Sequence, residues 1–388
     1  MTQALNLSQL ANNVNSSGQL AGSAVTGTVP SATNATNATN LTGGTCTIGS
    51  TQLGAGNASI MKNRIINGAM VIDQRNAGAS VTPTDGQYDV DRWCGRLTQA
   101  SKFTLQQTTN APVGFNYSLK ATSSSAYSVG SGDFFAIEQW IEGFNCADLG
   151  WGTANAKTVT LSFQVYSSLT GTFGGSLRTY AGGYSYPFSY SIPVANTWTT
   201  VSVIVTGATA GTWNTTNSGC IGVAFSLGAG SSFSGTAGAW AASTYFQPTG
   251  ATSVVGTNGA TFYITGVQLE VGSSATGYEY RQYGQELALC QRYASQVEQG
   301  IGYATSTTNI RFTIAYPVQM RASPTLTALS GTFRWNGPGI YDIGSTNLPA
   351  IAANDARAAT VDQTVSGAVT GIALATINGG AILFSAEL

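Results

Sequence analysis

The chain has 388 residues, of which 43% are hydrophobic and only 8% are charged, and its formal net charge is −1. This sparse, balanced charge is unlike that of proteins that hold nucleic acid or an anionic membrane surface through many Lys and Arg side chains. Histidine is absent, which excludes Ser–His and Cys–His nucleophile pairs and most zinc sites. We therefore expect a non-enzymatic protein with no cofactor, no metal site and no nucleic-acid partner.

Residues 1–62 are predicted to form an extended segment that a partner orders. The first 61 residues contain no Asp, Glu, Lys or Arg, and beyond one short apolar stripe they are mainly Ala, Thr, Asn, Ser and Gly. Such a composition cannot bury enough apolar surface to fold by itself. The opening Met1–Leu10 has neither the basic start nor the apolar run of a signal peptide, so synthesis in a reducing cytosol is expected.

Free thiols are the expected state of the five cysteines. They are odd in number, widely spaced and without a Cys-x-x-Cys pair, which favours buried thiols over a disulfide framework. They are Cys46, Cys94, Cys146, Cys220 and Cys290. No apolar run reaches the ~18 residues that would span a bilayer, so no membrane insertion is expected.

Residues 63–280 are predicted to form a jelly-roll-like β-sandwich. Apolar residues alternate with polar ones in short runs that Gly-, Ser-, Thr- and Asn-rich turns separate, as in half-buried strands. The clearest runs are 115–121, 159–165, 201–205 and 221–227. No charged residue occurs from Thr179 through Leu269, which fits core strands and loops solvated by hydroxyls and amides.

One predicted strand changes phase at Thr265–Gly266. Phe262 and Ile264 share one face, whereas the set Val267, Leu269 and Val271 falls on the other. One extra residue at Gly266, a β-bulge, would return both sets to the core.

A helix and a second, smaller β-domain are predicted to follow. Residues 283–299 have apolar side chains four apart and good helix formers between them, so residues 281–300 are expected to be a connecting helix. Alternation then returns in 301–388, with Pro317 marking an edge strand or a strand end. Near the C-terminus, Asn378–Gly379–Gly380 predicts a hairpin turn, because these residues tolerate positive φ.

Two groups of acidic residues are candidates for reactive or metal-binding sites. Asp85, Asp89 and Asp91 have no calcium-loop spacing, and charge balance of Asp89 or Asp91 by Arg92 is the simpler role. Glu138 and Glu142 are four residues apart, about 13 Å on an extended strand, beyond the roughly 5–9.5 Å that a glycosidase needs.

Two aromatic regions combine the chemistry that binds sugars. Sugar rings stack on Trp and Tyr faces, and sugar hydroxyls bond to Asn, Asp, Gln or Arg nearby. In both regions burial of the aromatics in a core is the competing interpretation, and it is the preferred one for the aromatics of 180–190. The candidates are Arg334, Trp335, Asn336, Tyr341 and Asp342, around a tight turn at Gly337–Pro338–Gly339, and Phe233, Trp240 and Tyr245.

Several motifs resemble bacteriophage tail-fibre and receptor-binding proteins. They are ALNLSQLANNVNSSGQL, NRIINGAMVIDQRNAG, YDVDRW, ADLGWGTANAKTVTLSF, SLRTYAGGYSYPFSYSIP, GAWAASTYF, FYITGVQLEVGSSATGYEYRQYGQELALCQRY and PVQMRASPTLT. The resemblance covers most of 5–327. It implies a homotrimeric virion appendage, attached to tail or capsid proteins through residues 1–62, with a sandwich akin to carbohydrate-binding modules.

The function expected from these observations is non-catalytic binding of host-surface polysaccharide during adsorption, with weak contacts summed by avidity. A glycan depolymerase is one alternative. A capsid-mounted or structural tail fibre without its own receptor is another. A secreted bacterial adhesin is a third, which the missing signal peptide disfavours.

Overall fold

The computed structural model describes residues 61–297, 301–306, 308–337, 339–343, 350–364 and 371–388. All of them belong to one compact unit, Ala55–Leu388. The predicted extended segment, with Cys46, lies outside the described residues except for Met61 and Lys62.

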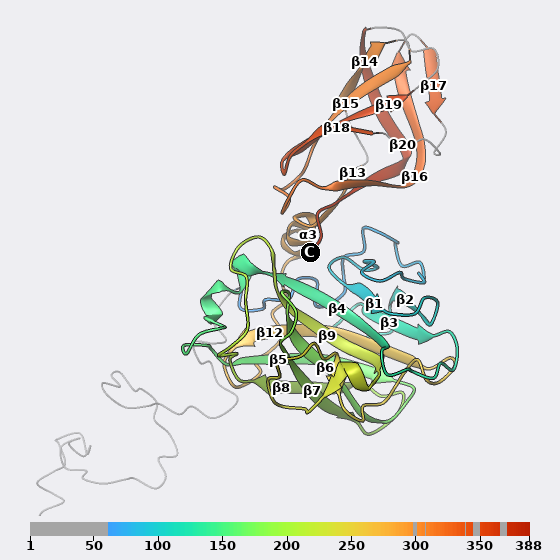
Figure 1. Cartoon of the computed structure of the whole chain (residues 1–388). Coiled ribbons are helices and arrows are strands. Elements are labelled where there is room, and N and C mark those ends of the chain that lie inside the picture. The colour runs from blue at the N-terminus through green and yellow to red at the C-terminus, as the bar shows by residue number, and fades with distance from the viewer. Residues whose placement is uncertain (1–60, 298–300, 307, 338, 344–349, 365–370) are drawn as a thin grey trace, which may run out of the picture. The chain divides into compact units, whose positions relative to one another are not determined.

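Two five-stranded antiparallel sheets form a jelly-roll-like β-sandwich, as predicted (Figure 1). The first, here the β4 sheet, has the order β1-β4-β9-β6-β7, and its strands are β1 (Cys94–Leu97), β4 (Phe134–Glu142), β9 (Gly219–Ala229), β6 (Gly171–Thr179) and β7 (Ser185–Ile192). The second, here the β5 sheet, has the order β2-β3-β12-β5-β8, and its strands are β2 (Phe103–Thr108), β3 (Ser118–Ser123), β12 (Thr261–Val271), β5 (Val159–Ser167) and β8 (Thr199–Val205).

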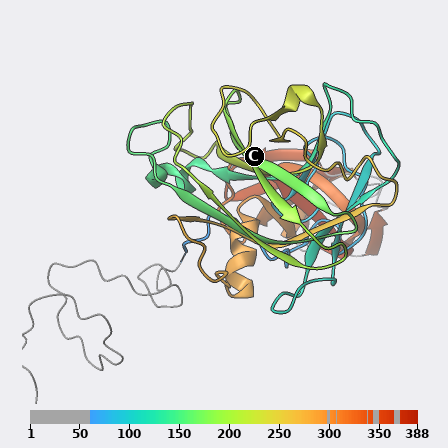
Figure 2. The ribbon, with the colours of Figure 1, turned by 90° about the horizontal axis from the view of Figure 1, so that it is seen from below.

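Short elements lie in the connections between these strands. They are the 3₁₀ helices η2 (Gly143–Asn145), η3 (Ala147–Leu149) and η4 (Ser231–Phe233), and the paired strands β10 (Ser234–Gly235) and β11 (Gln247–Pro248). Figure 2 shows the same ribbon from below.

The core of the sandwich follows from the alternation read in the sequence. In β5, Val159, Leu161, Phe163 and Val165 are buried, while the residues between them form the outer side. Equivalent residues of both sheets join one apolar cluster that includes the fully buried Phe103, Phe173, Phe188, Phe225 and Phe262. Burying a side chain of this size stabilises the fold by roughly 1.5–3 kcal/mol. The run 180–190 contributes Tyr186, Phe188 and Tyr190 to this core, as predicted.

The predicted β-bulge is confirmed. The pairing of β12 with β5 shifts between Thr265 and Gln268, and Gly266 has a φ of +63°. The shift leaves Phe262, Ile264, Val267 and Leu269 buried. Val271 was wrongly included, because it ends the strand and its side chain is 44% exposed.

The predicted helix is real but shorter than expected. Helix α3 spans Tyr283–Gln291, and Ala294–Val297 is a strand, β13. Strand β13 pairs antiparallel with a later strand, so that Ala294 lies opposite Ser385 and Val297 lies opposite Ile382. Pairing with a strand 85 to 91 residues away in the sequence overrides the local helix propensity of these residues, because ladder hydrogen bonds replace helical ones.

A separate eight-stranded sheet, outside the sandwich, contains β13 and the strands after it. Its order is β17-β16-β20-β14-β15-β19-β18, with β13 beside β20. Its small core includes Phe312, Ile314, Val361 and Phe384. The strands are β14 (Ile301–Ser306), β15 (Asn309–Ala315), β16 (Thr325–Gly337), β17 (Gly339–Ile343), β18 (Ala350–Asn354), β19 (Ala358–Thr364) and β20 (Gly371–Ser385).

Two sequence predictions in this sheet have different outcomes. Strand β15 ends at Ala315, two residues before Pro317, as predicted. Proline has no N–H group to donate to a neighbouring strand, so the strand pairing stops before it. The hairpin at Asn378–Gly379–Gly380 is wrong, because β20 continues through it. Both halves of β20 pair with the one strand β16, and the Gly pair falls where that pairing shifts register near Ser330.

The four described cysteines, Cys94, Cys146, Cys220 and Cys290, are free and buried, as predicted. Among the described residues, no helix is both long and apolar enough to cross a membrane.

Candidate functional site

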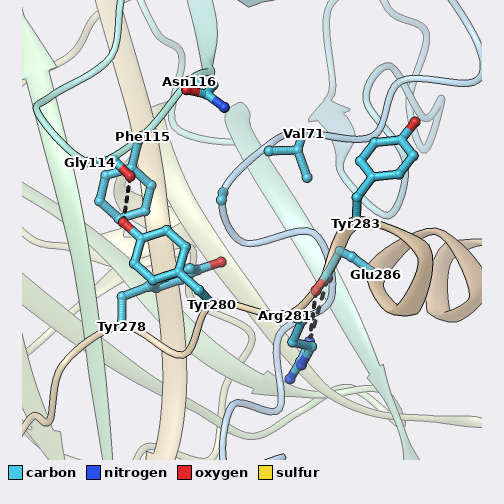
Figure 3. A pocket seen from close by; sticks show the side chains of 10 residues that line it. Val71, Gly114, Phe115, Asn116, Tyr278, Tyr280, Arg281, Tyr283 and Glu286 are labelled. Atoms are coloured by element: carbon cyan, nitrogen blue, oxygen red, sulfur yellow. Dashed lines mark hydrogen bonds and ion pairs between the residues drawn. The ribbon is translucent and has the colours of Figure 1, made fainter.

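A pocket of about 220 Å³ lies where three loop segments and the start of α3 meet (Figure 3). The first segment includes Val71, the second precedes β3, and the third joins β12 to α3. Its lining is Ala69, Val71, Gly114, Phe115, Asn116, Tyr278, Tyr280, Arg281, Tyr283 and Glu286. The lining thus combines four aromatic rings with an amide, a guanidinium and a carboxylate.

The aromatic wall is a cluster of three rings. The centroid of Phe115 lies 5.1 Å from that of Tyr278 and 5.5 Å from that of Tyr280, and the two tyrosines are 4.9 Å apart. The hydroxyl of Tyr280 donates to the carbonyl oxygen of Gly114 at 2.6 Å, which ties the two loops together. Phe115 was expected to belong to a strand, but β3 begins only at Ser118.

Two rings remain open to solvent at this pocket. The side chain of Tyr280 is 60% exposed and that of Tyr283 is 64% exposed. Asn116 is exposed too. Within the part of the chain that the structure describes, neither the Asn116 amide nor the Tyr283 hydroxyl has a hydrogen-bond partner. These groups are therefore free to contact a ligand.

Arg281 and Glu286 form a fixed, buried ion pair beside the rings, with 3.4 Å between Nη1 and Oε2. Nη1 of Arg281 also donates to the Ile65 carbonyl at 3.0 Å, and Nη2 lies 3.5 Å from Glu279. Glu286 accepts the backbone N–H of Asn67 as well. These contacts hold both charges in place and leave one arginine among two carboxylates.

Tyr278 stays protonated at any ordinary pH. Burial raises the pKa of its hydroxyl well above the usual range, and the nearby Glu286 carboxylate adds to this. The pocket therefore has the neutral ring of Tyr278 beside the Arg281–Glu286 ion pair.

The aromatics predicted in 233–247 lie in two separate packed groups. Trp240 stacks on Tyr184 with centroids 5.3 Å apart, and its indole N–H donates to the Thr206 carbonyl at 2.8 Å. Phe233 packs on Phe134, 5.0 Å away. Tyr245 is half-buried and covers Gly235. The three residues do not form one site, and all lie outside the pocket lining.

The candidates in 333–342 lie on the hairpin of β16 and β17. The backbone register pairs Arg334 with Asp342, Trp335 with Tyr341 and Gly337 with Gly339, and Pro338 of the predicted tight turn lies outside the described residues. The side chains of Arg334, Trp335, Asn336, Tyr341 and Asp342 lie outside what the structure describes.

The acidic residues weighed as catalytic are held by arginines. Glu138 and Glu142 lie on the extended strand β4, as the distance argument assumed. Glu138 is fully buried and accepts from Arg178 Nε at 3.1 Å, while Glu142 accepts from Arg292 Nε at 2.9 Å.

The predicted partner of Asp89 and Asp91 is wrong. Arg92 pairs with Glu387 and donates to the Trp140 carbonyl, because Asp91 is already bound by the backbone and side chain of Gln74. Asp89 accepts from Asn76 instead.

Sequence reasoning missed the pocket, although its signal was present. The stretch Tyr278–Tyr283 reads YEYRQY and has the same mixture of rings and polar groups that singled out the other regions. The contribution of Phe115 and Asn116 depends on folding, since they are more than 160 residues away.

No protein-family model matches this sequence, and no curated protein matches it. Among solved structures, the enzymatically active domain of tailspike protein 4 of bacteriophage CBA120 is similar, with 15% identity and a TM-score of 0.30 over 54% of this chain and 22% of that chain. This chain thus spans under a quarter of that tailspike.

Two smaller proteins are similar over their whole lengths. One is a putative sugar binding protein from Bacteroides thetaiotaomicron, with 12% identity and a TM-score of 0.33 over 54% of this chain and 100% of that one. The other is the CBM22-1 xylan-binding domain of Paenibacillus barcinonensis Xyn10C, with 11% identity and a TM-score of 0.27 over 52% of this chain and 99% of that one. These likenesses assign no function to this chain, and the fold assignment rests on the strand pairing above.

Proposed function

We propose that this chain is a phage fibre subunit that binds a host-surface glycan without cleaving it, and that the tyrosine-lined pocket is a contact site. The observation that carries the proposal is the exposed pair Tyr280 and Tyr283 beside the unpartnered amide of Asn116. Flat rings pack on the C–H faces of a sugar, and the amide offers both a donor and an acceptor to its hydroxyls.

The fixed pair Arg281 and Glu286 supports a role in recognition. Both side chains are already held by the backbone, so a sugar hydroxyl that meets them meets groups that lose little further conformational entropy on binding. Sites of this kind bind polar, uncharged ligands through a few well-placed hydrogen bonds.

A non-catalytic role is supported by the composition of the lining. Hydrolysis of a glycosidic bond ordinarily uses two carboxyl groups that flank the bond, one of them a proton donor. Among the described lining residues Glu286 is the one carboxyl, and Arg281 holds it in an ion pair.

The assignment to a virion rests on the sequence resemblance to phage tail-fibre and receptor-binding proteins. In this proposal residues 1–62 attach the fibre to tail or capsid proteins, and three copies present the pocket together. Weak single-site contacts are then summed by avidity, which a monomeric module lacks.

Binding of the full chain to an array of purified bacterial surface polysaccharides tests the pocket. We expect Tyr283→Ala and Asn116→Ala each to weaken binding about tenfold or more without lowering the melting temperature, since both side chains are exposed. Phe144→Ala, an equally exposed aromatic (61%) outside the lining, is the matched control and should bind normally.

Two other results would redirect the proposal. Normal binding by both pocket variants, together with loss of binding by Trp335→Ala with Tyr341→Ala, would move the site to the hairpin of β16 and β17. Release of reducing ends from a bound polysaccharide would replace the binding role with that of a depolymerase.

A further inference from the structure

The outer side of the β5 sheet carries a row of side chains at right angles to its strands. Tyr263 of β12 is opposite Lys120 of β3 on one side and Tyr166 of β5 on the other. Trp198 directly precedes β8, whose Thr199 is opposite Val165, so it extends the row beyond Tyr166. None of these four residues lines the pocket.

The three rings of this row contact one another and remain partly open to solvent. The centroids of Tyr166 and Tyr263 are 5.0 Å apart, and those of Tyr166 and Trp198 are 5.5 Å apart. All three side chains are half-buried, unlike the core residues that alternate with them on the same strands. The result is an aromatic surface on a rigid sheet.

Lys120 places a cation at one end of this surface. Its Nζ lies 5.8 Å from the centroid of the Tyr263 ring. Within the described residues no carboxylate lies within ion-pair distance of it. Its neighbour on β2, opposite in register, is the uncharged Gln106.

Lys120 is one of very few charged residues in the strands of the β5 sheet. The five strands contain one other charged residue, Glu270, near the end of β12. Glu270 is 3% exposed and already accepts hydrogen bonds from Thr276 and Gln268. Lys120 is therefore an unneutralised cation beside aromatic rings, on a face whose other exposed side chains in these strands, Ile204 among them, are uncharged.

We propose that this row is a second glycan-contact surface, and that it takes a sugar unit bearing a carboxylate, such as a uronic acid. The rings of Tyr166, Tyr263 and Trp198 pack on the sugar, and the Lys120 ammonium pairs with the carboxylate. Charge complementarity selects this occupant. The pocket lining offers no such cation, because Arg281 is held between Glu279 and Glu286.

The pocket and the row would each recognise a different kind of sugar unit in the same host polysaccharide. The inference rests on the proposed glycan-binding function but uses other residues, so each surface can fail by itself. A host polysaccharide with both neutral and acidic units would satisfy both surfaces, and a polysaccharide with neutral units alone would satisfy only the pocket.

Calorimetric titration of the full chain tests the row with three acidic hexasaccharides as probes, made of galacturonate, guluronate or sialic acid. We expect at least one to bind, with an affinity that falls as salt rises. Reducing its carboxylates to alcohols should weaken binding about tenfold or more. Failure of all three probes to bind would overturn the proposal.

Matched variants separate the cation from general effects of mutation. Lys120→Met should weaken binding of the acidic probe about tenfold, and Lys120→Arg should restore most of it. Lys102→Met is the control, because Lys102 also lies on a ring, with its Nζ 4.5 Å from the centroid of Tyr127. Equal binding by Lys120→Met and the unaltered chain would refute the proposed row.

The pocket variant Tyr283→Ala distinguishes this inference from the proposed function. Acidic-probe binding that survives Tyr283→Ala and is lost in Lys120→Met supports the row whatever the pocket does. Acidic-probe binding that is lost in Tyr283→Ala and unchanged in Lys120→Met assigns the acidic sugar to the pocket and refutes the row.

Discussion

Most buried charges in the sandwich are neutralised by specific partners. Arg178 pairs with Glu138 and lies over the ring of Phe246, 3.9 Å from its centroid. Glu142 is bound by Arg292 and by the hydroxyl of Tyr293 at 2.6 Å. Removing one partner of such a pair costs about 3–5 kcal/mol, because the other charge stays buried without compensation. These residues thus serve the fold, whereas Asn116 and Tyr283 at the pocket and Lys120 in the outer row have no hydrogen-bond or ion-pair partner among the described residues.

Asp89 is a buried carboxyl whose titration affects stability. Burial, and then the charge of Asp73, raise its pKa from 3.8 to about 7, although Arg75 opposes the shift. Between these two values the folded chain holds a proton that the unfolded chain releases. The stability that this group contributes is therefore present below about pH 4 and is lost as pH rises through about 7.

Asp89→Asn should remove this dependence. The free energy of unfolding, measured by urea titration, should be nearly unchanged at pH 4 and higher by on the order of 4 kcal/mol at pH 8, because the pKa shift of Asp89 then destabilises only the parent. Asp148→Asn, at an exposed carboxyl, serves as the control and should show no such gain. A variant that is less stable than the parent at pH 8 would show that the charged form of Asp89 is stabilised by its surroundings.

At the scale of elements, the bulge in β12 links the core to the pocket. A Cβ at Gly266 would lie 2.7 Å from Cζ of Phe115, whose ring forms part of the aromatic wall. The positive φ of Gly266 also disfavours any other residue. The bulge that keeps Val267 and Leu269 in the core thereby also provides the space for Phe115.

Gly266→Ala should therefore destabilise the fold and weaken glycan binding at the pocket. We expect a loss of about 1–3 kcal/mol in the free energy of unfolding, from the backbone strain and the displaced ring. Gly259→Ala is the matched control, since Gly259 has a φ of +71° and open space where its Cβ would lie. Its free energy of unfolding should fall by only about 1 kcal/mol, from the backbone strain alone, and it should bind the glycan normally. Equal losses in both variants would mean that Phe115 adapts freely.

At the scale of the whole molecule, the proposed fibre requires assembly. Uncharged strands such as β7, β8 and β9 suit close packing between identical copies, because no unpaired charge has to be buried. Light scattering at micromolar concentration should give three times the chain mass of 39.9 kDa. A mass of 39.9 kDa would contradict the trimer and the avidity argument together.

Removing residues 1–56 tests whether this segment attaches the chain to the virus particle. The remainder contains every described strand, so it should stay folded and soluble but no longer join virus particles. Incorporation of the shortened chain would show that attachment lies elsewhere.

The sequence alone determined the elements whose signal is local. Period-two alternation located β5, β8 and β9, because each strand of a sandwich must present every second side chain to the core. A break in that alternation located the bulge at Gly266. The start of α3 was equally readable, since its helix formers are neighbours along the chain.

Only the tertiary structure decided the features that depend on distant partners. Helix α3 ends at Gln291 because β13 pairs with β20, and β20 passes through its Gly pair because β16 flanks both halves. Arg92 bonds to Glu387, almost 300 residues away. The pocket forms because folding brings Phe115 and Asn116 to Tyr278–Tyr283, and no local pattern encodes a contact whose partners are chosen by the packing of the sheets.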